Sequence, residues 1–253
     1  MQRNRQLRTR GVILKKQPIG ESDLFITIHS PDFGKIQAAA KGARRMTSQF
    51  SGHLEPLNVC SFQLYRTPQR YTITQCEVEA NFKGIRENFE RSMLATLLLE
   101  IFHKSTYSDE HCRELFNLLE ETLHRLHKTA RSFITIEMFK LNLLQLIGVL
   151  PNLNNCSVCH LRWNEQHQIR LDDEGHLRCQ ACAPKTGASK IEFPIIKLIH
   201  YLTGPDTGKS TNIKLNPQQK KQLRFITNLF LQHYINREII SEKILMQLGQ
   251  KAA

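Results

Sequence analysis

The chain has 253 residues, of which 40% are hydrophobic and 23% charged, and this composition excludes a disordered or fibrous protein. It holds no apolar window of eighteen residues, and its basic start lacks the apolar segment of a secretory signal, so neither a membrane span nor secretion is predicted. We therefore expect a cytoplasmic protein with one large or two ordinary domains, whose net charge of +12 favours an anionic partner.

The charge is concentrated at the two ends of the chain. Residues 1–50 hold ten Lys and Arg against three Asp and Glu, whereas residues 51–183 hold fourteen against sixteen. Residues 184–253 again carry an excess, with eleven against four. Such basic segments can be ordinary solvated surface, or they can bind a polyanion, most often a nucleic acid. Both interpretations stay open at this point.

The first eighty residues are predicted to form β-structure. Short runs rich in apolar and β-branched residues occur at 11–19, 23–30, from 34, 58–66 and 71–79. No helical pattern separates them, and turn residues lie between them, so the runs read as five strands. Five short strands of this kind favour a small barrel, with a longer connection between the third and the fourth strand.

From about Asn81 the apolar residues recur at helical spacing. Helices are predicted at 91–104, 110–128, 132–148, 194–202, 216–235 and 241–249. Gly148 and Pro151 end the third of these helices, and Pro217 suits the first turn of the fifth. The pattern indicates an α+β protein with a barrel domain at 1–80 and a helical domain at 81–253.

Four of the seven cysteines form two C-x-x-C pairs with nineteen residues between the pairs. The pairs are Cys156 with Cys159 and Cys179 with Cys182. Zinc prefers a tetrahedron of thiolates, and each C-x-x-C turn delivers two of them. Two strand-like pieces around the turn DDEG would bring the pairs together, so we predict a zinc ribbon at about 152–184.

Because four thiolates complete the coordination shell, the predicted Zn²⁺ is structural, and the nearby His160 and His176 are not ligands. A redox dithiol is the weaker alternative for this segment. The other three cysteines, for which no partner is predicted, are Cys60, Cys76 and Cys112.

No catalytic constellation is present in the sequence. The segment GPDTGKST, Gly204 to Thr211, resembles a phosphate-binding loop. However, three residues separate its glycines where four are needed, and a predicted helix precedes it where a strand is needed. Neither a G-x-S-x-G nor an H-E-x-x-H motif occurs, so we predict that the chain is not an enzyme.

The cluster KGARR follows the third predicted strand and supplies Lys41, Arg44 and Arg45. Small five-stranded barrels bind single-stranded nucleic acid through such loops, often with aromatic faces for the bases. The aromatic candidates are Phe25, Phe62, Tyr65 and Tyr71, although core filling is the favoured alternative for Phe25 and Phe62.

The run GVILKKQPIGESDLFITIHSPDFGKIQAAAKGARR, Gly11 to Arg45, resembles the opening of the RecO family of bacterial recombination mediators. The helical middle and the four-cysteine segment match the family in order and spacing, so the resemblance covers essentially the whole chain. It implies an N-terminal five-stranded OB-fold β-barrel followed by an α-helical domain with an inserted four-cysteine zinc ribbon. One departure is the basic start MQRNRQLRTR, which is longer than the family leads us to expect.

The resemblance also implies a function and a set of partners. RecO-like proteins bind single- and double-stranded DNA, anneal complementary strands without ATP, act with RecR, bind the acidic C-terminal tail of single-strand binding protein, and help to load RecA. The DNA-contacting role falls on Lys41, Arg44 and Arg45, with Lys35 and Arg10 as additions. The resemblance further implies a cytoplasmic, nucleoid-associated protein that repairs DNA damage in the RecFOR pathway.

The basic last part of the chain suits an acidic tail, and its candidates for that contact are Lys220, Lys221 and Arg224. The alternative function is a zinc-dependent adaptor that binds acidic protein tails and has no direct role on DNA.

Overall fold

The computed structural model describes residues 5–68, 70–107, 112–128, 132–204, 213–235 and 238–251, without the side chains of Cys112 and 246–251. The segment GPDTGKST lies outside the described residues except for Gly204. The chain divides into two compact units, 1–132 with 239–253, and 133–238. The last strand of the barrel ends at Ala80, and the domain boundary near residue 80 stays a prediction.

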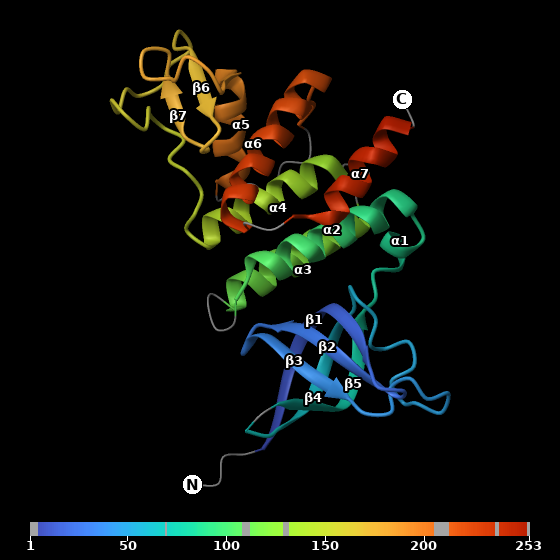
Figure 1. The fold of residues 1–253 in the computed structure, drawn as a ribbon. Helices are drawn as coiled ribbons and strands as arrows, with labels where there is room; N and C mark the ends of the chain where they lie inside the picture. Colours follow the sequence, from blue (N-terminus) through green and yellow to red (C-terminus); the bar gives the residue numbers. More distant parts are fainter. Residues whose placement is uncertain are drawn as a thin grey trace. The chain divides into compact units, whose positions relative to one another are not determined.

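The first unit contains a closed five-stranded barrel with the strand order β1-β2-β3-β5-β4 (Figure 1). Its strands are β1 (Gln6–Ile19), β2 (Asp23–Ser30), β3 (Gly34–Ala40), β4 (Val59–Arg66) and β5 (Tyr71–Ala80). Parallel pairing of β3 with β5 closes the barrel, with Ala38 opposite Tyr71. Alternate residues fill the interior, among them Ile13, Ile26 and Phe62. The predicted OB-fold barrel is confirmed.

The first strand is longer than the sequence pattern indicated. It begins at Gln6 instead of Gly11, and its first half pairs with β4 from Gln6↔Tyr65 to Gly11↔Cys60. The reason is that inward-facing residues alternate with arginines in this segment. Leu7 packs against the barrel core, and Thr9 is 6% exposed. Residues 6–10 of the basic start therefore form part of the barrel wall.

Four helices complete the first unit: α1 (Lys83–Arg86), α2 (Phe89–Ser105), α3 (Cys112–Lys128) and α7 (Ile240–Lys251). Asn88 caps α2 by accepting a hydrogen bond from the Arg91 amide. The carboxylate of Glu100 on α2 accepts hydrogen bonds from the amides of Ile240 and Ser241, at 3.0 and 2.8 Å. These bonds hold the first turn of α7 against α2.

The second unit contains the helices α4 (Ser132–Leu146), α5 (Phe193–Thr203) and α6 (Pro217–Ile235). A three-stranded sheet of order β7-β6-β8 accompanies them. Its strands are β6 (Ile169–Asp172), β7 (Leu177–Cys179) and β8 (Ala188–Ile191). The third of these strands was not predicted, because its sequence ASKI has too few apolar residues to mark a strand. The helical segments themselves match the predicted ranges closely.

A buried ion pair within α4 is hydrogen-bonded to α6. The side chains of Glu137 and Lys140 are each 2% exposed, and Lys140 Nζ lies 3.3 Å from Glu137 Oε1. Lys140 Nζ also donates to Asn228 Oδ1 at 2.8 Å, and the Thr227 hydroxyl donates to Glu137. Both charges are therefore hydrogen-bonded, as buried charges must be.

None of the helices in the described part of the chain has the length and apolar character needed to cross a bilayer.

Candidate nucleic-acid interface and metal centre

The basic loop, residues 41–46, is exposed and anchored to the turn between β1 and β2. Lys41, Arg44 and Arg45 are all exposed. The Gly42 amide donates to Asp23 Oδ1 at 2.7 Å, and this bond lowers the pKa of the Asp23 carboxyl, with smaller contributions from other neighbours. Gly42 has a φ of 65°, which favours glycine there.

The cations of the basic loop remain on the surface. Arg44 Nη1 donates to the Gly20 carbonyl at 3.1 Å. Among the residues that the structure describes, no carboxylate forms a close ion pair with Lys41, Arg44 or Arg45. Met46, at the end of the loop, is fully exposed beside them. The loop thus offers three cations and one apolar side chain to solvent.

An aromatic groove of about 570 Å³ opens on the same barrel. It lies along the ends of β2 and β3 and the β4–β5 connection, where OB-folds bind oligonucleotides. The aromatic and basic side chains that line it are Phe25, Phe33, Tyr71, Lys35, Arg66 and Arg70. The Arg66 guanidinium lies over the Tyr71 ring, 5.7 Å from its centroid.

The aromatic groove is related to the basic loop through the pairing of β2 with β3. Phe25 is opposite Ala39 in the sheet, two residues before Lys41. Core filling is confirmed for Phe62, which is 0% exposed, but is wrong for Phe25, which is half-buried and lines the groove. The residues that sequence reasoning missed are Phe33, Arg66 and Arg70. Their only signal was proximity to turns, in PDFG and RTPQR.

Lys35 and Arg10 are occupied by contacts within the first unit. Lys35 Nζ donates to the carbonyls of His103, at 2.7 Å, and Thr106, which end α2, and burial lowers the pKa of this ammonium. Arg10 forms ion pairs with Glu79 at 2.7 Å and Glu120 at 2.8 Å. The structure therefore groups Lys41, Arg44 and Arg45 and gives these two cations other partners.

The four cysteines of the predicted ribbon come together in the second unit. Their sulfur atoms all lie within 4.8 Å of one another, and Cys159 Sγ is 3.8 Å from Cys179 Sγ. A tetrahedron with Zn–S bonds of about 2.3 Å has S–S edges of about 3.8 Å, so the spacing fits such an ion. The group can therefore hold a metal ion without either nearby histidine.

Backbone hydrogen bonds shape the two C-x-x-C turns. The His160 amide donates to the Cys156 carbonyl at 3.0 Å, and the Ala183 amide donates to that of Cys179 at 2.9 Å. Burial raises the pKa of the Cys156 thiol, but backbone amides, led by that of Cys159, lower it to about 6. The first turn thus favours the thiolate of Cys156, which is the form that binds metals.

A second group of potential ligands, Asp172, Glu174 and His176, lies on the β6–β7 hairpin. The Asp172 carboxylate is already used there, because it pairs with Arg178 at 2.6 Å and accepts a hydrogen bond from the His176 amide at 2.8 Å. We therefore attribute this group to the turn and not to a metal site.

Comparison with known proteins identifies relatives over nearly the whole chain. Residues 1–82 match the family model "Recombination protein O N terminal", and residues 86–243 match "Recombination protein O C terminal". The chain is 30% identical to the DNA repair protein RecO of Alkaliphilus metalliredigens, over 91% of this chain and 94% of that protein. It is 29% identical to the DNA repair protein RecO of Syntrophus aciditrophicus, over 95% of each chain.

Proposed function

The chain belongs to the RecO family, and on this premise we propose that it is a recombinational DNA repair mediator that binds single- and double-stranded DNA and anneals complementary strands without ATP. The observation that carries the proposal is the exposed group Lys41, Arg44 and Arg45 on the same barrel as the aromatic groove. No bond in the DNA is made or broken in this activity, so it requires no catalytic group.

Annealing follows from charge neutralisation. Two strands repel each other through their phosphates, and cations that neutralise phosphates on both strands let complementary bases meet. In our proposal the basic loop contacts phosphates, and Phe25 and Tyr71 stack with bases that enter the groove. Lys35 and Arg10 contribute less, because their cationic groups already have partners in the fold.

The four cysteines hold one Zn²⁺ in this proposal. The ion is structural because four thiolates leave no open position for substrate. Metal binding supplies roughly 10–16 kcal/mol to small modules of this kind, which adds to the burial of a few apolar side chains such as Ile169 and Leu171.

We further propose that the protein acts with RecR, binds the acidic tail of single-strand binding protein, and helps to load RecA at the nucleoid. An aromatic and basic cluster in the second unit supports a contact with an acidic tail. Arg224 and Lys220 lie over the ring of Phe133, at 5.0 and 6.0 Å from its centroid. Their positive charges complement acidic residues, and the ring complements an apolar side chain.

Replacing Lys41, Arg44 and Arg45 with alanine tests the DNA site. We expect affinity for a single-stranded oligonucleotide to fall by orders of magnitude at moderate salt, with a smaller salt slope, because three phosphate contacts are lost. The matched control removes the same charge from the exposed residues Lys83, Lys128 and Lys190. Filter binding over a range of salt concentrations measures both quantities. Equal affinity of the two triple variants would contradict the assignment of DNA binding to the basic loop.

Strand annealing with and without single-strand binding protein, in the absence of ATP, tests the activity itself. Annealing that requires ATP would contradict the proposal. The alternative, a zinc-dependent adaptor for acidic tails, predicts no gel shift with bare oligonucleotide even at low salt, while a tail peptide still binds.

A further inference from the structure

Two cysteines outside the metal centre lie together in the barrel wall. Cys60 is on β4 and Cys76 is on the adjacent antiparallel strand β5. Cys60 is opposite Val78, and Cys76 is opposite Phe62, so the two cysteines are diagonal neighbours on one face of the sheet. The sequence alone indicates no partner for either one, because strand register cannot be read from their spacing.

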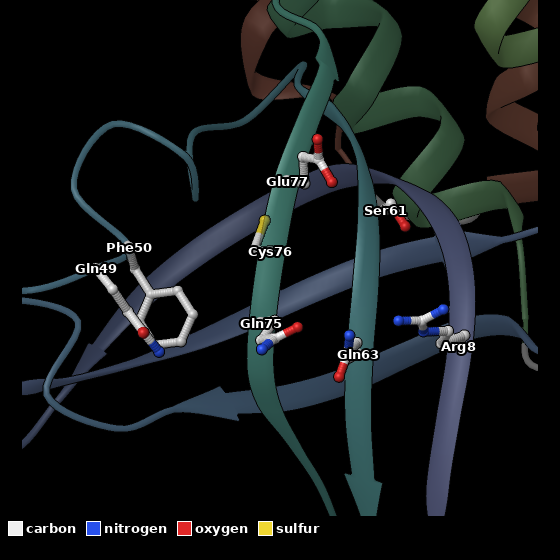
Figure 2. A pocket seen from close by; sticks show the side chains of 8 residues that line it. All are labelled: Arg8, Gln49, Phe50, Ser61, Gln63, Gln75, Cys76 and Glu77. Atoms are coloured by element: carbon white, nitrogen blue, oxygen red, sulfur yellow. The ribbon is translucent and has the colours of Figure 1, made fainter.

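The two thiols differ in their access to solvent. Cys60 is 0% exposed, whereas Cys76 is half-buried and lines a surface cavity of about 400 Å³. Figure 2 shows Cys76 on β5 between Gln75 and Glu77, in a cavity that also bears Arg8 and Phe50. A small polar oxidant that enters this cavity meets Cys76 and does not meet Cys60.

The two thiols also differ in reactivity. The Cys60 thiol donates to the His53 carbonyl oxygen at 3.8 Å. Interaction with the neighbouring sulfur of Cys76, together with burial, raises the pKa of Cys60. The same interaction lowers the pKa of Cys76, against the opposing effect of burial. An accessible thiol with a lowered pKa beside a buried second thiol is the arrangement found in peroxide-sensing cysteine pairs.

We propose that Cys76 and Cys60 form an oxidant-responsive pair, in which hydrogen peroxide oxidises Cys76 and Cys60 then closes a disulfide across β4 and β5. In the first step the Cys76 thiolate attacks peroxide, the O–O bond breaks, and a sulfenic acid and hydroxide form. In the second step the Cys60 sulfur displaces the sulfenic oxygen, which leaves as water after taking up the remaining protons. Two thiols and one peroxide thus become one disulfide and two waters.

The position of the pair makes the disulfide reversible and gives it a structural effect. Diagonal neighbours in a sheet have Cα atoms about 7–8 Å apart, which is just beyond the usual limit for a disulfide. Closing the bond therefore draws the strands together next to the register irregularity between Val59 and Cys60. A strained disulfide is reduced easily, as a regulatory one must be.

Peptide mapping of the full-length, metal-loaded protein tests the proposal. The reduced protein is treated with hydrogen peroxide, free thiols are alkylated, and proteolytic peptides are identified by mass spectrometry. We expect the peptide pair linked through Cys60 and Cys76 to be the main disulfide product, and dithiothreitol to abolish it. Cys112→Ser, which removes a thiol outside the pair, should leave this product unchanged.

Two variants separate the roles of the thiols. Cys76→Ser should leave Cys60 reduced, whereas Cys60→Ser should accumulate a sulfenic acid at Cys76 that dimedone traps. Cys60→Ala replaces Cys60→Ser if a hydroxyl at this buried position unfolds the barrel, as judged by circular dichroism. Recovery of both cysteines in alkylated form after peroxide treatment of the parent protein would overturn the proposal, and so would oxidation of Cys76 to sulfinic acid with Cys60 still alkylated.

Discussion

The barrel and the cysteine segment are both small β-structures, but they are ordered by different means. The barrel strands run for 7 to 14 residues and enclose a continuous apolar core. The sheet of the cysteine segment has strands of 3 or 4 residues, and it gathers four thiols to one point. The barrel can thus keep its shape by burial, whereas in our proposal the cysteine segment depends on its metal ion. The difference predicts which region each perturbation will affect.

Metal removal should have the largest effect and should affect the second unit alone. Cys156→Ser, or chelation of the parent protein, is expected to release the ion and to expose the backbone of residues 152–184, while the barrel keeps its amide protection. The free energy at stake is roughly 10–16 kcal/mol for modules of this kind. Metal analysis with hydrogen–deuterium exchange measures both outcomes, and His160→Ala is the control that should retain the metal. Loss of protection in β1 to β5 on chelation would show that the barrel also depends on the metal.

Gly11→Ala should destabilise the barrel and leave the second unit unchanged. A Cβ atom at Gly11 would lie 2.3 Å from Ile28 Cγ2 and 3.1 Å from the His29 carbonyl oxygen. Overpacking of this kind costs about 1–3 kcal/mol of the free energy of unfolding. Urea denaturation should show the loss, whereas Gln75→Ala, at an exposed site on β5, should not. Zinc content should be the same in both variants.

Tyr71→Ala should weaken binding of single-stranded DNA by about 1–3 kcal/mol, through the loss of one stacking contact. The dependence of affinity on salt should not change, because no cation is removed. Fluorescence anisotropy with a labelled oligonucleotide measures both quantities, and Tyr201→Ala is a control at an exposed tyrosine of the second unit. A reduced salt slope for Tyr71→Ala would show that its effect reaches the basic loop.

Acidification should release α7 from α2. This is the smallest of the expected effects. Burial raises the pKa of Glu100, but hydrogen bonds from Lys104, Ser241 and Ile240 outweigh it and lower the pKa from 4.5 to about 2. The stabilisation is therefore fully present above pH 4.5 and is lost as the pH falls through about 2.

Glu100→Gln removes the same charge at neutral pH. We expect a loss of about 0.5–2 kcal/mol, as for other helix caps, seen as faster amide exchange in α7. The exposed Glu90→Gln, on the same helix, is the control. Unchanged exchange in α7 for Glu100→Gln would show that this contact does not hold the helix.

The sequence alone predicted the elements whose signal is strong within one segment, whereas α1, β8 and residues 6–10 of β1 were not predicted. Alternation in 23–30 and 71–79 predicted β2 and β5, the helical period predicted α2 to α7, and two C-x-x-C pairs predicted the gathering of four thiols. Each of these signals arises within one segment, so no knowledge of the rest of the chain is needed to detect it.

Contacts between side chains of different strands and helices became visible only in the tertiary structure. In the fold, Lys35 donates to the carbonyls that end α2, and Arg10 pairs with Glu79 and Glu120. Lys41, Arg44 and Arg45 are exposed. The fold also places Cys60 beside Cys76 and forms the aromatic groove from residues of several strands. The partner of a charge or a thiol depends on strand register and on packing between distant segments, and neither property is encoded in the spacing of residues along the chain.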